Sequence, residues 1–357
     1  MQFYRGVRLH FRDRAINKQI QHIHNEPRIE GKFSNVDNRR FNVLSATKNK
    51  VYDVAIIGGG FAGLSAALLL GRYLRPVAIF DWGKTRNDNT EHIHSYLGLE
   101  NASPRTFIKK AWKDVLQYNS VRAIKQKVQR IENYNQYFVV RTEENEPSII
   151  AKYIIIATGV RDIKPDLKNF SEIDGNGAWH CPHCDGLEAA GKKLTIIGNG
   201  KNGGIMSYTK EFLGWTNQIT VFIQDNHHLD QKEIDEAKRL SIDIIDNDPL
   251  IEVLDKRPDS DGINLLSKSG KLYNTDVIFY HIGYEVQTQL AKQLGCHLEE
   301  GFIKINNKQE TTVAKVYAAG DVDTDRHYVV LAVASGAVAA ISIYEDILKK
   351  TLEQYSD

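Results

Sequence analysis

The chain first shows a regular pattern where a short, continuously apolar run is followed by glycines. Residues 54–57 read Val-Ala-Ile-Ile, a β-branched composition typical of a strand that is buried on both faces. A glycine-rich turn occupies 58–63, and an Ala- and Leu-rich stretch predicts a helix over 64–70. Another apolar run at 77–80 predicts the next strand. This order of elements predicts a β-α-β unit with a glycine-rich first turn.

A second unit of the same design follows later in the chain. Its predicted parts are a strand over 193–197, a turn over 198–203, a helix over 206–213 and a strand over 219–223. Further strands are predicted at 153–156, 277–280 and 315–318, with a long last helix from about 329 to 352. Two such units in one chain predict an α/β fold with two Rossmann-like dinucleotide-binding domains.

The first glycine-rich turn has the residues that a pyrophosphate requires. Glycines at such a turn let the backbone approach the phosphates and direct the helix N-terminus at their charge. The turn places Gly58, Gly60 and Gly63 at the expected spacing, and Asp81 follows the next strand where a carboxylate binds ribose hydroxyls. We therefore predict an adenine dinucleotide here, the alternative being a glycine-rich turn used only for packing.

The second glycine-rich turn does not indicate one particular nucleotide. Gly198, Gly200 and Gly203 have the same spacing, but the following strand ends in Gln-Asp-Asn, with Asp225 in the middle. A 2′-phosphate favours Arg or Lys at this place, and a carboxylate repels it. NADPH is therefore disfavoured and NADH remains open, as does a retained fold whose nucleotide site is altered or lost.

Residues 179–186, Trp-His-Cys-Pro-His-Cys-Asp-Gly, carry the candidate chemistry. Two thiols separated by two residues can close a small disulfide ring, and one thiol of such a pair can have a lowered pKa. His180 and His183 flank Cys181 and Cys184 and could stabilise a thiolate, and Asp185 could protonate a departing thiolate. We interpret the cysteines as a redox pair.

Two other interpretations of the cysteines stay open. Zinc also binds cysteines at this spacing, but a structural site needs two more ligands. The remaining candidates, Cys296 and His297, are distant in sequence, and there is no second CxxC motif. A pair of inert, reduced thiols is the other alternative. Cys296 itself is interpreted as a packed residue, and no metal site is predicted.

Composition limits the function further. The 357 residues are 42% hydrophobic and 25% charged with net charge +1, so no global field recruits nucleic acid or an anionic membrane. Three cysteines and no signal peptide argue against a disulfide-stapled secreted fold. No apolar run is long and uninterrupted enough to predict a membrane span.

Residues 1–49 are Arg-rich but interrupted by acids, which favours a structural or partner-facing extension over an organelle transit peptide. A cytoplasmic protein is expected by default.

The order of motifs along residues 51–346 closely resembles one family, the low-molecular-weight thioredoxin reductases and their relatives among the pyridine nucleotide-disulfide oxidoreductases. The resemblance rests on both glycine-rich turns, on Cys-x-x-Cys-Asp-Gly at 181–186, and on three shorter motifs. These three are Ala157-Thr158-Gly159, Ile282-Gly283 and Ala318-Ala319-Gly320-Asp321-Val322.

The resemblance implies a homodimer with a discontinuous FAD domain. That domain would comprise 51–163 and 276–346, with an NAD(P)-type domain at 164–275 carrying the cysteines, an N-terminal extension at 1–50 and a C-terminal tail at 347–357. Cys184 would lie next to the flavin, Cys181 would attack the substrate disulfide, and Asp185 would be the acid. The residues implied to contact FAD are Gly58, Gly60, Phe61, Ala62, Gly63, Asp81, Ser95, Thr158, Gly159, Gly320, Asp321, Tyr328 and Val329.

Three segments depart from the family pattern. The family's NADPH-reading His-Arg-Arg is Gln224-Asp225-Asn226 here, and its flavin-side Tyr-Arg-Gln is His327-Tyr328-Val329. The segment His94-Ser95-Tyr96-Leu97-Gly98 is more similar to the branch of dithiol oxidases, which close disulfides in small metabolites. Relatives that use ferredoxin or a second flavin in place of a pyridine nucleotide also exist.

Three functions follow from these observations. The leading one is an FAD-dependent oxidoreductase that exchanges electrons with a thioredoxin-like protein or a small dithiol or disulfide through Cys181 and Cys184. Its donor would be NADH, ferredoxin, a second FAD or an oxygen-linked route. The alternatives are an NADPH-dependent thioredoxin reductase and a non-catalytic flavoprotein that acts as a sensor or docking module.

Overall fold

The structure is a computed structural model, and it describes residues 51–134, 136–142, 149–200, 204–225, 227–256 and 262–355. The predicted extension over 1–50 and Gly203 of the second turn lie outside these residues.

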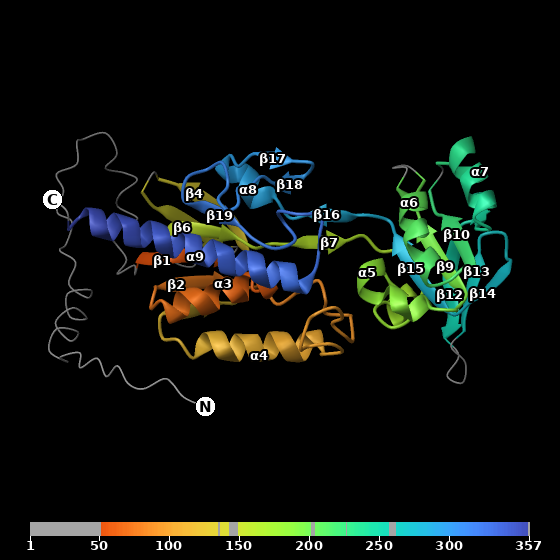
Figure 1. The fold of residues 1–357 in the computed structure, drawn as a ribbon, viewed down its shortest axis with the longest axis horizontal. Helices are drawn as coiled ribbons and strands as arrows, with labels where there is room; N and C mark the ends of the chain where they lie inside the picture. The colour runs from red at the N-terminus through yellow and green to blue at the C-terminus, as the bar shows by residue number, and fades with distance from the viewer. Residues whose placement is uncertain are drawn as a thin grey trace, which may run out of the picture. The chain divides into compact units, whose positions relative to one another are not determined.

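Within the described residues, the first glycine-rich turn belongs to a seven-stranded sheet of order β3-β2-β1-β6-β5-β4, with β19 beside β6 (Figure 1). Strands β3, β2, β1, β6 and β19 are parallel, and β4 and β5 form an antiparallel extension. The strands are β1 (Val51–Ile57), β2 (Val77–Phe80), β3 (Val121–Ile124), β4 (Val128–Asn133), β5 (Phe138–Thr142), β6 (Ile149–Ile156) and β19 (Val316–Ala318).

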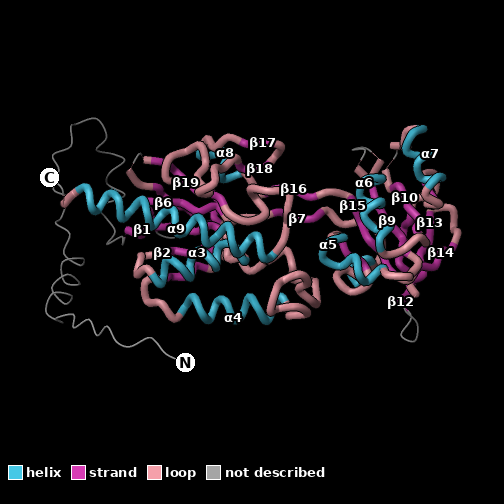
Figure 2. Tube along the Cα trace, in the orientation of Figure 1, coloured by secondary structure: helices cyan, strands magenta, loops and turns pink. Residues whose placement is uncertain are grey.

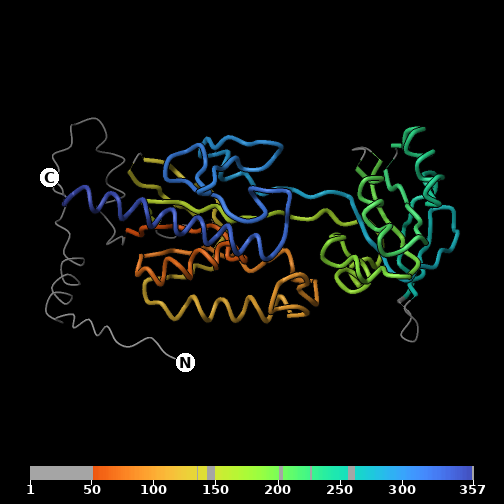
Figure 3. Tube along the Cα trace, in the orientation of Figure 1, coloured from red at the N-terminus to blue at the C-terminus, as the bar shows by residue number. Residues whose placement is uncertain are grey.

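The chain returns to the start of this sheet at its end. Figure 3 shows the blue C-terminal helix α9 (Val329–Glu353) beside the orange helix α3 (Phe61–Arg72). The two helices pack closely because α9 carries a glycine at the crossing: a Cβ atom at Gly336 would lie 2.0 Å from the backbone oxygen of Ala62. The hydroxyl of Ser65 also donates to the carbonyl of Val333 across the same contact, at 2.7 Å. Helix α4 (Pro104–Leu116) covers α3.

This crossing gives a first prediction. Gly336→Ala should lower the free energy of unfolding by about 1–3 kcal/mol, because the added methyl group has no space beside Ala62. Gly214→Ala is a matched control, since a Cβ atom there would meet no described atom within 4 Å. Urea unfolding of both variants measures the difference, and equal midpoints would contradict the prediction.

By length and composition, α9 could also span a membrane. Its small residues Ala332, Gly336, Ala339 and Ala340 are buried, and with Ile343 they face α3 and the sheet. These are the contacts of a core helix.

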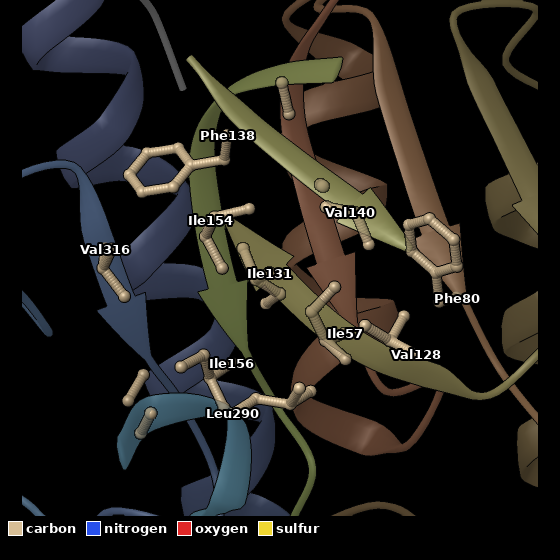
Figure 4. Packing of buried hydrophobic residues seen from close by; sticks show 14 of the residues in the cluster. Ile57, Phe80, Val128, Ile131, Phe138, Val140, Ile154, Ile156, Leu290 and Val316 are labelled. Atoms are coloured by element: carbon tan, nitrogen blue, oxygen red, sulfur yellow. The ribbon is translucent and has the colours of Figure 1, made fainter. Parts of the chain in front are cut away.

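The opposite face of the sheet carries the second half of the core. Figure 4 shows Ile57, Phe80, Ile154 and Ile156 converging with side chains from the antiparallel strands. Helix α8 (Gln289–Leu294) contributes Leu290 to the same cluster. The short strands β17 (Leu298–Glu299) and β18 (Phe302–Ile303) follow α8.

A five-stranded sheet of order β11-β10-β9-β15-β8 holds the second glycine-rich turn. All its strand pairs are parallel. A three-stranded antiparallel sheet, β12-β13-β14, accompanies it, as Figure 2 shows in magenta. The strands are β8 (Ala178–Trp179), β9 (Leu194–Gly198), β10 (Ile219–Ile223), β11 (Asp243–Ile245), β12 (Leu250–Lys256), β13 (Ile263–Ser267), β14 (Leu272–Thr275) and β15 (Val277–His281). The helices are α5 (Pro182–Asp185), α6 (Ile205–Lys210) and α7 (Gln231–Arg239), with short 3-10 turns at Phe170–Glu172, Gly186–Ala189 and Glu211–Gly214.

Two short strands connect the sheets. Strand β7 (Val160–Asp162) leads out of the first sheet, β16 (Tyr284–Val286) leads back, and the two pair in antiparallel fashion. Strand β15 pairs with β9 in the second sheet, so the predicted return to the first domain at residue 276 is too early, and the chain returns only through β16. Similarly, α9 runs unbroken to Glu353 through most of the predicted tail at 347–357. The predicted α/β fold with two Rossmann-like units is confirmed.

Candidate active site

The redox pair lies at a sharp turn after β8. Cys181 and Cys184 form a disulfide with their Cα atoms 5.3 Å apart. Pro182 occupies the first position of α5, where its missing N–H is not needed, and Cys181 is the N-cap. The backbone N–H of Cys184 donates to the sulfur of Cys181 at 3.1 Å. One helical turn therefore brings both sulfurs to the same side of the chain.

Asp185 follows the second cysteine and is only 7% exposed. Burial raises the pKa of its carboxyl group to about 7, and the charge of Glu188 raises it as well, whereas the nearby His94 and His92 imidazoles lower it. An ordinary aspartate would be ionised at neutral pH. Asp185 can instead hold or release a proton there, as an acid beside a thiol pair requires.

A cavity of about 640 Å³ joins the redox pair to the first sheet. Both cysteines and Asp185 line it from the second sheet's side. The residues predicted to contact FAD that also line it are Phe61, Asp321, Tyr328 and Val329. The tertiary structure thus brings the predicted redox pair together with part of the predicted flavin site.

The first glycine-rich turn fits a pyrophosphate. Gly58 has φ +118°, and a Cβ atom at Gly63 would lie 1.9 Å from the carbonyl oxygen of Gly58. At Gly60 a Cβ atom would meet no described atom within 4 Å, and no side chain caps the N-terminus of α3 at Phe61 and Ala62. The N–H of Gly58 donates to the carbonyl of Phe80 at 2.9 Å, so the space for a phosphate lies at Gly60 and the uncapped start of α3. Asp81 lies against the turn, its Cβ atom 2.6 Å from the Cβ position of Gly59.

The other predicted flavin residues differ in their settings. Gly159 (φ +65°) has open space around its Cβ position, and the hydroxyl of Thr158 donates to the carbonyl of Gln287 at 2.7 Å. The N–H of Gly320 donates to the hydroxyl of Ser335 at 2.8 Å. Ser95, by contrast, is exposed and does not line the cavity.

A buried ion-pair network that the sequence did not predict lies beside the cavity. Arg86 donates to both oxygens of Asp162 at 2.6 and 2.8 Å and to Asp321 at 2.9 Å. Burial would raise the pKa of Asp162, but the hydrogen bonds from Arg86 and the charges of His180 and Arg86 hold it below its usual value. Since Asp162 ends β7, Arg86 ties the connecting strand to the Gly320-Asp321 turn. No local motif marks this arginine.

The two predicted flanking histidines occupy different environments. His180 is part-buried, with Nε2 3.6 Å from Asp162, and burial lowers its pKa. His183 is 59% exposed on its side chain and lies 3.2 Å from Glu211. Its ring centroid is 6.2 Å from that of Tyr328 on the first sheet's side.

A further histidine, His327, belongs to the second of the departing segments, His327-Tyr328-Val329. Its Nε2 atom is buried and has no hydrogen-bond partner among the described residues. The ring packs edge-on against Tyr284, with centroids 4.9 Å apart, and lines the cavity. The His327 residue thus lines the cavity, while its Nε2 atom is enclosed by protein.

The second glycine-rich turn is closed in part by its own chain. The carboxylate of Asp225 accepts a hydrogen bond from the N–H of Gly200 at 2.9 Å and lies 3.2 Å from His227 Nδ1. A Cβ atom at Gly200 would lie 2.0 Å from the carbonyl oxygen of His227, and one at Gly198 would lie 2.2 Å from Ile205.

The remaining cysteine is separate from the redox pair. Cys296 is a buried free cysteine whose Sγ lies 3.5 Å from the hydroxyl of Thr311. Among the described residues, no group of three or more His, Cys, Asp or Glu side chains is placed to hold a metal ion.

Comparison with known proteins gives a consistent result. The model of the family described as "Pyridine nucleotide-disulphide oxidoreductase" matches residues 52–340. The chain is 26% identical over 321 residues to the thioredoxin reductase of Bacillus subtilis, covering 86% of this chain and 99% of that one. It is 29% identical over 314 residues to thioredoxin reductase sirT of Leptosphaeria maculans, covering 84% and 95%. The crystal structure of thioredoxin reductase from Streptococcus pyogenes superposes with a TM-score of 0.76 at 26% identity, covering 85% and 100%.

Proposed function

Because this chain belongs to the pyridine nucleotide-disulphide oxidoreductase family, we propose that it exchanges electrons between FAD and a protein or small-molecule disulfide through Cys181 and Cys184. The chain is a thioredoxin reductase-like oxidoreductase, and its family implies FAD and a pyridine nucleotide. One observation carries the proposal. The Cys181–Cys184 disulfide, the buried Asp185 and the predicted flavin contacts Phe61 and Asp321 all line one cavity.

The described residues fit FAD. The open space at Gly60 and Gly159 and the uncapped start of α3 support this assignment. We propose that the turn from Gly58 to Gly63 binds the pyrophosphate and that Asp81 binds the ribose hydroxyls. When bound, FAD supplies the two-electron chemistry that interconverts a disulfide and two thiols.

The hydrogen bonds of the pair support separate roles for the two cysteines. Once the disulfide is reduced, the N–H of Cys184 that donates to Cys181 would stabilise a thiolate at Cys181. Cys181 would then be the sulfur that attacks the substrate, leaving Cys184 as the partner that closes the disulfide again. Asp185 would give a proton to the departing thiolate, or take one in the opposite direction.

The environment of Asp225 supports an electron donor other than NADPH. Its carboxylate follows β10 and accepts the hydrogen bond from Gly200. In a Rossmann-like domain this is where the 2′-phosphate of NADPH binds, and a carboxylate there would repel that phosphate. NADH, ferredoxin, a second flavin and an oxygen-linked route remain as the candidates. NADPH-dependent thioredoxin reduction is the alternative.

An anaerobic titration tests the donor. We expect a dithiol to bleach the flavin band near ~450 nm and NADPH to leave it unchanged. Asp225→Ser should then raise any response to NADPH relative to NADH, because the repelling charge is gone. Stoichiometric bleaching by NADPH of the unaltered protein would favour the alternative, and two flavins per chain would identify a second FAD.

The substrate class and assembly are also proposals. The relatives are named thioredoxin reductases, which supports a thioredoxin-like protein as substrate. A small dithiol is the second candidate, because the redox pair opens into a cavity. By the family resemblance we propose a homodimer, which sedimentation of the purified chain would test.

A further inference from the structure

The Asp185 carboxyl group has no protein partner for the proton that it exchanges. It is only 7% exposed, and none of the described residues donates a hydrogen bond to it. A buried carboxyl group without a hydrogen bond is costly, so such groups usually serve a function. An acid that turns over repeatedly also needs a route by which its proton is replaced. Asp185 therefore needs a proton-exchanging group within the cavity.

The charged groups that face Asp185 come from two segments. His94 and His92 come from the loop after β2, and Glu188 comes from the turn after α5. Both histidines line the same cavity as Asp185. Because Glu188 carries a like charge, the two imidazoles are the groups that can exchange a proton favourably with Asp185.

Of the two histidines, His94 is held in place. Its Nδ1 atom lies 2.7 Å from a carboxylate oxygen of Glu100, and its side chain is 18% exposed. His92 has no carboxylate partner among the described residues: its Nδ1 atom lies 3.3 Å from the carbonyl oxygen of Asn101, and its ring centroid is 6.0 Å from that of His94. A carboxylate at Nδ1 fixes the orientation of an imidazole and leaves Nε2 to exchange protons.

The loop that carries this pair is built to keep Glu100 beside His94. Ile93 is 3% exposed and forms two backbone hydrogen bonds with Asn101 and Ala102, at 2.9 and 2.8 Å, which close the loop. Ser95 adopts φ +60°, and its N–H donates to the second oxygen of Glu100 at 2.8 Å. Since a serine seldom adopts this conformation, the loop holds it by these contacts.

We propose that His94, oriented by Glu100, is the residue that exchanges protons between Asp185 and solvent during each redox cycle. The inference rests on the proposed function, in which Asp185 is the acid for the cysteine pair. When the enzyme disulfide is reduced, Asp185 gives its proton to the departing thiolate and becomes a carboxylate. His94 passes a proton through the cavity to Asp185 and takes another from water beside the exposed Glu100 carboxylate, so the imidazole returns to its starting state. In the oxidative direction each proton moves the opposite way.

Single-turnover reduction of the Cys181–Cys184 disulfide by dithiothreitol tests this proposal in the full chain. The reaction is quenched in acid and the new thiols are alkylated and counted, so the readout does not depend on turnover of the flavin. We expect His94→Ala to slow reduction about ten-fold and to change its pH profile around neutrality. Added imidazole should restore the rate in proportion to its concentration. Glu100→Gln should have a smaller effect in the same direction, because the imidazole remains but loses its orienting carboxylate.

Matched variants separate this proposal from the proposed function. His228 also pairs with a carboxylate, Asp246 at 3.3 Å, but lies outside the cavity, so His228→Ala should react like the unaltered chain with or without imidazole. Asp185→Asn should lose the neutral pH transition. An unchanged rate and profile in His94→Ala, or a slow rate that imidazole does not restore, would overturn the role of His94. An Asp185→Asn variant with the unaltered profile would instead overturn the role of Asp185 in the proposed function.

Discussion

Replacing Cys184 with serine should abolish the exchange of electrons with disulfides and dithiols, by at least about 1,000-fold, without preventing folding or FAD binding. A serine hydroxyl cannot form or accept the disulfide that couples the flavin to the substrate. Cys181→Ser should have the same effect, because the two sulfurs act as one unit. Spectroscopic flavin content and the rate of flavin reduction by dithiothreitol measure the two parts of the expectation separately.

Cys296→Ser provides the matched control for these variants. It removes the remaining thiol of the chain, which is buried beside Thr311 and outside the cavity. We expect this variant to keep the rate of the unaltered protein. Full biological activity in Cys181→Ser would contradict the proposed enzyme and favour the alternative of a non-catalytic flavoprotein that serves as a sensor or docking module.

Loss of Arg86 should be the most destabilising change in the network beside the cavity. Arg86→Ala leaves the carboxylates of Asp162 and Asp321 without their shared cation, and their side chains are only 12% and 18% exposed. Breaking a buried ion pair from one side costs about 3–5 kcal/mol. Arg86→Lys should recover only part of the lost free energy of unfolding, because an ammonium group cannot make the two parallel hydrogen bonds to Asp162. Urea unfolding measures both variants.

The same strand offers a control for this prediction. Arg161 on β7 pairs with Glu285 on β16 at 2.6 Å, but the two side chains are 71% and 52% exposed. Exposed pairs contribute about 0–1 kcal/mol, so Arg161→Ala should change the unfolding midpoint little. If Arg86→Ala and Arg161→Ala lost the same free energy of unfolding, burial of the Arg86 network would not explain the loss. We also expect Arg86→Ala to lower flavin content, since Asp321 lies in the predicted flavin site.

The local parts of the candidate site could be predicted because short motifs specify them. Gly58 has a positive φ, and a Cβ atom at Gly63 would lie 1.9 Å from the carbonyl oxygen of Gly58, so both positions require glycine. Cys181 and Cys184 are three positions apart, so one helical turn brings their sulfurs together wherever the segment lies in the fold. Asp185 follows them directly. The sequence could therefore name these residues without knowing what surrounds them.

Other features depended on contacts between distant parts of the chain. Arg86 meets Asp162 and Asp321 across 76 and 235 positions, and no motif links the three. Strand β15 could have joined either sheet by its apolar pattern, and its pairing with β9 corrected the predicted domain boundary. His94 belongs to a segment that departs from the family pattern, but only the tertiary structure shows that it lines the same cavity as Asp185.

By itself, then, the sequence determined the α/β fold class, the two glycine-rich turns and the cysteine pair, because backbone conformation and short-range spacing are encoded locally. Only the tertiary structure decided that Asp185 is buried and holds its proton up to a pH of about 7, and which charges surround it. The physical reason is that the pKa of a side chain depends on its access to solvent and on the charges near it. Residues far apart in the chain determine both, and the fold alone brings them together.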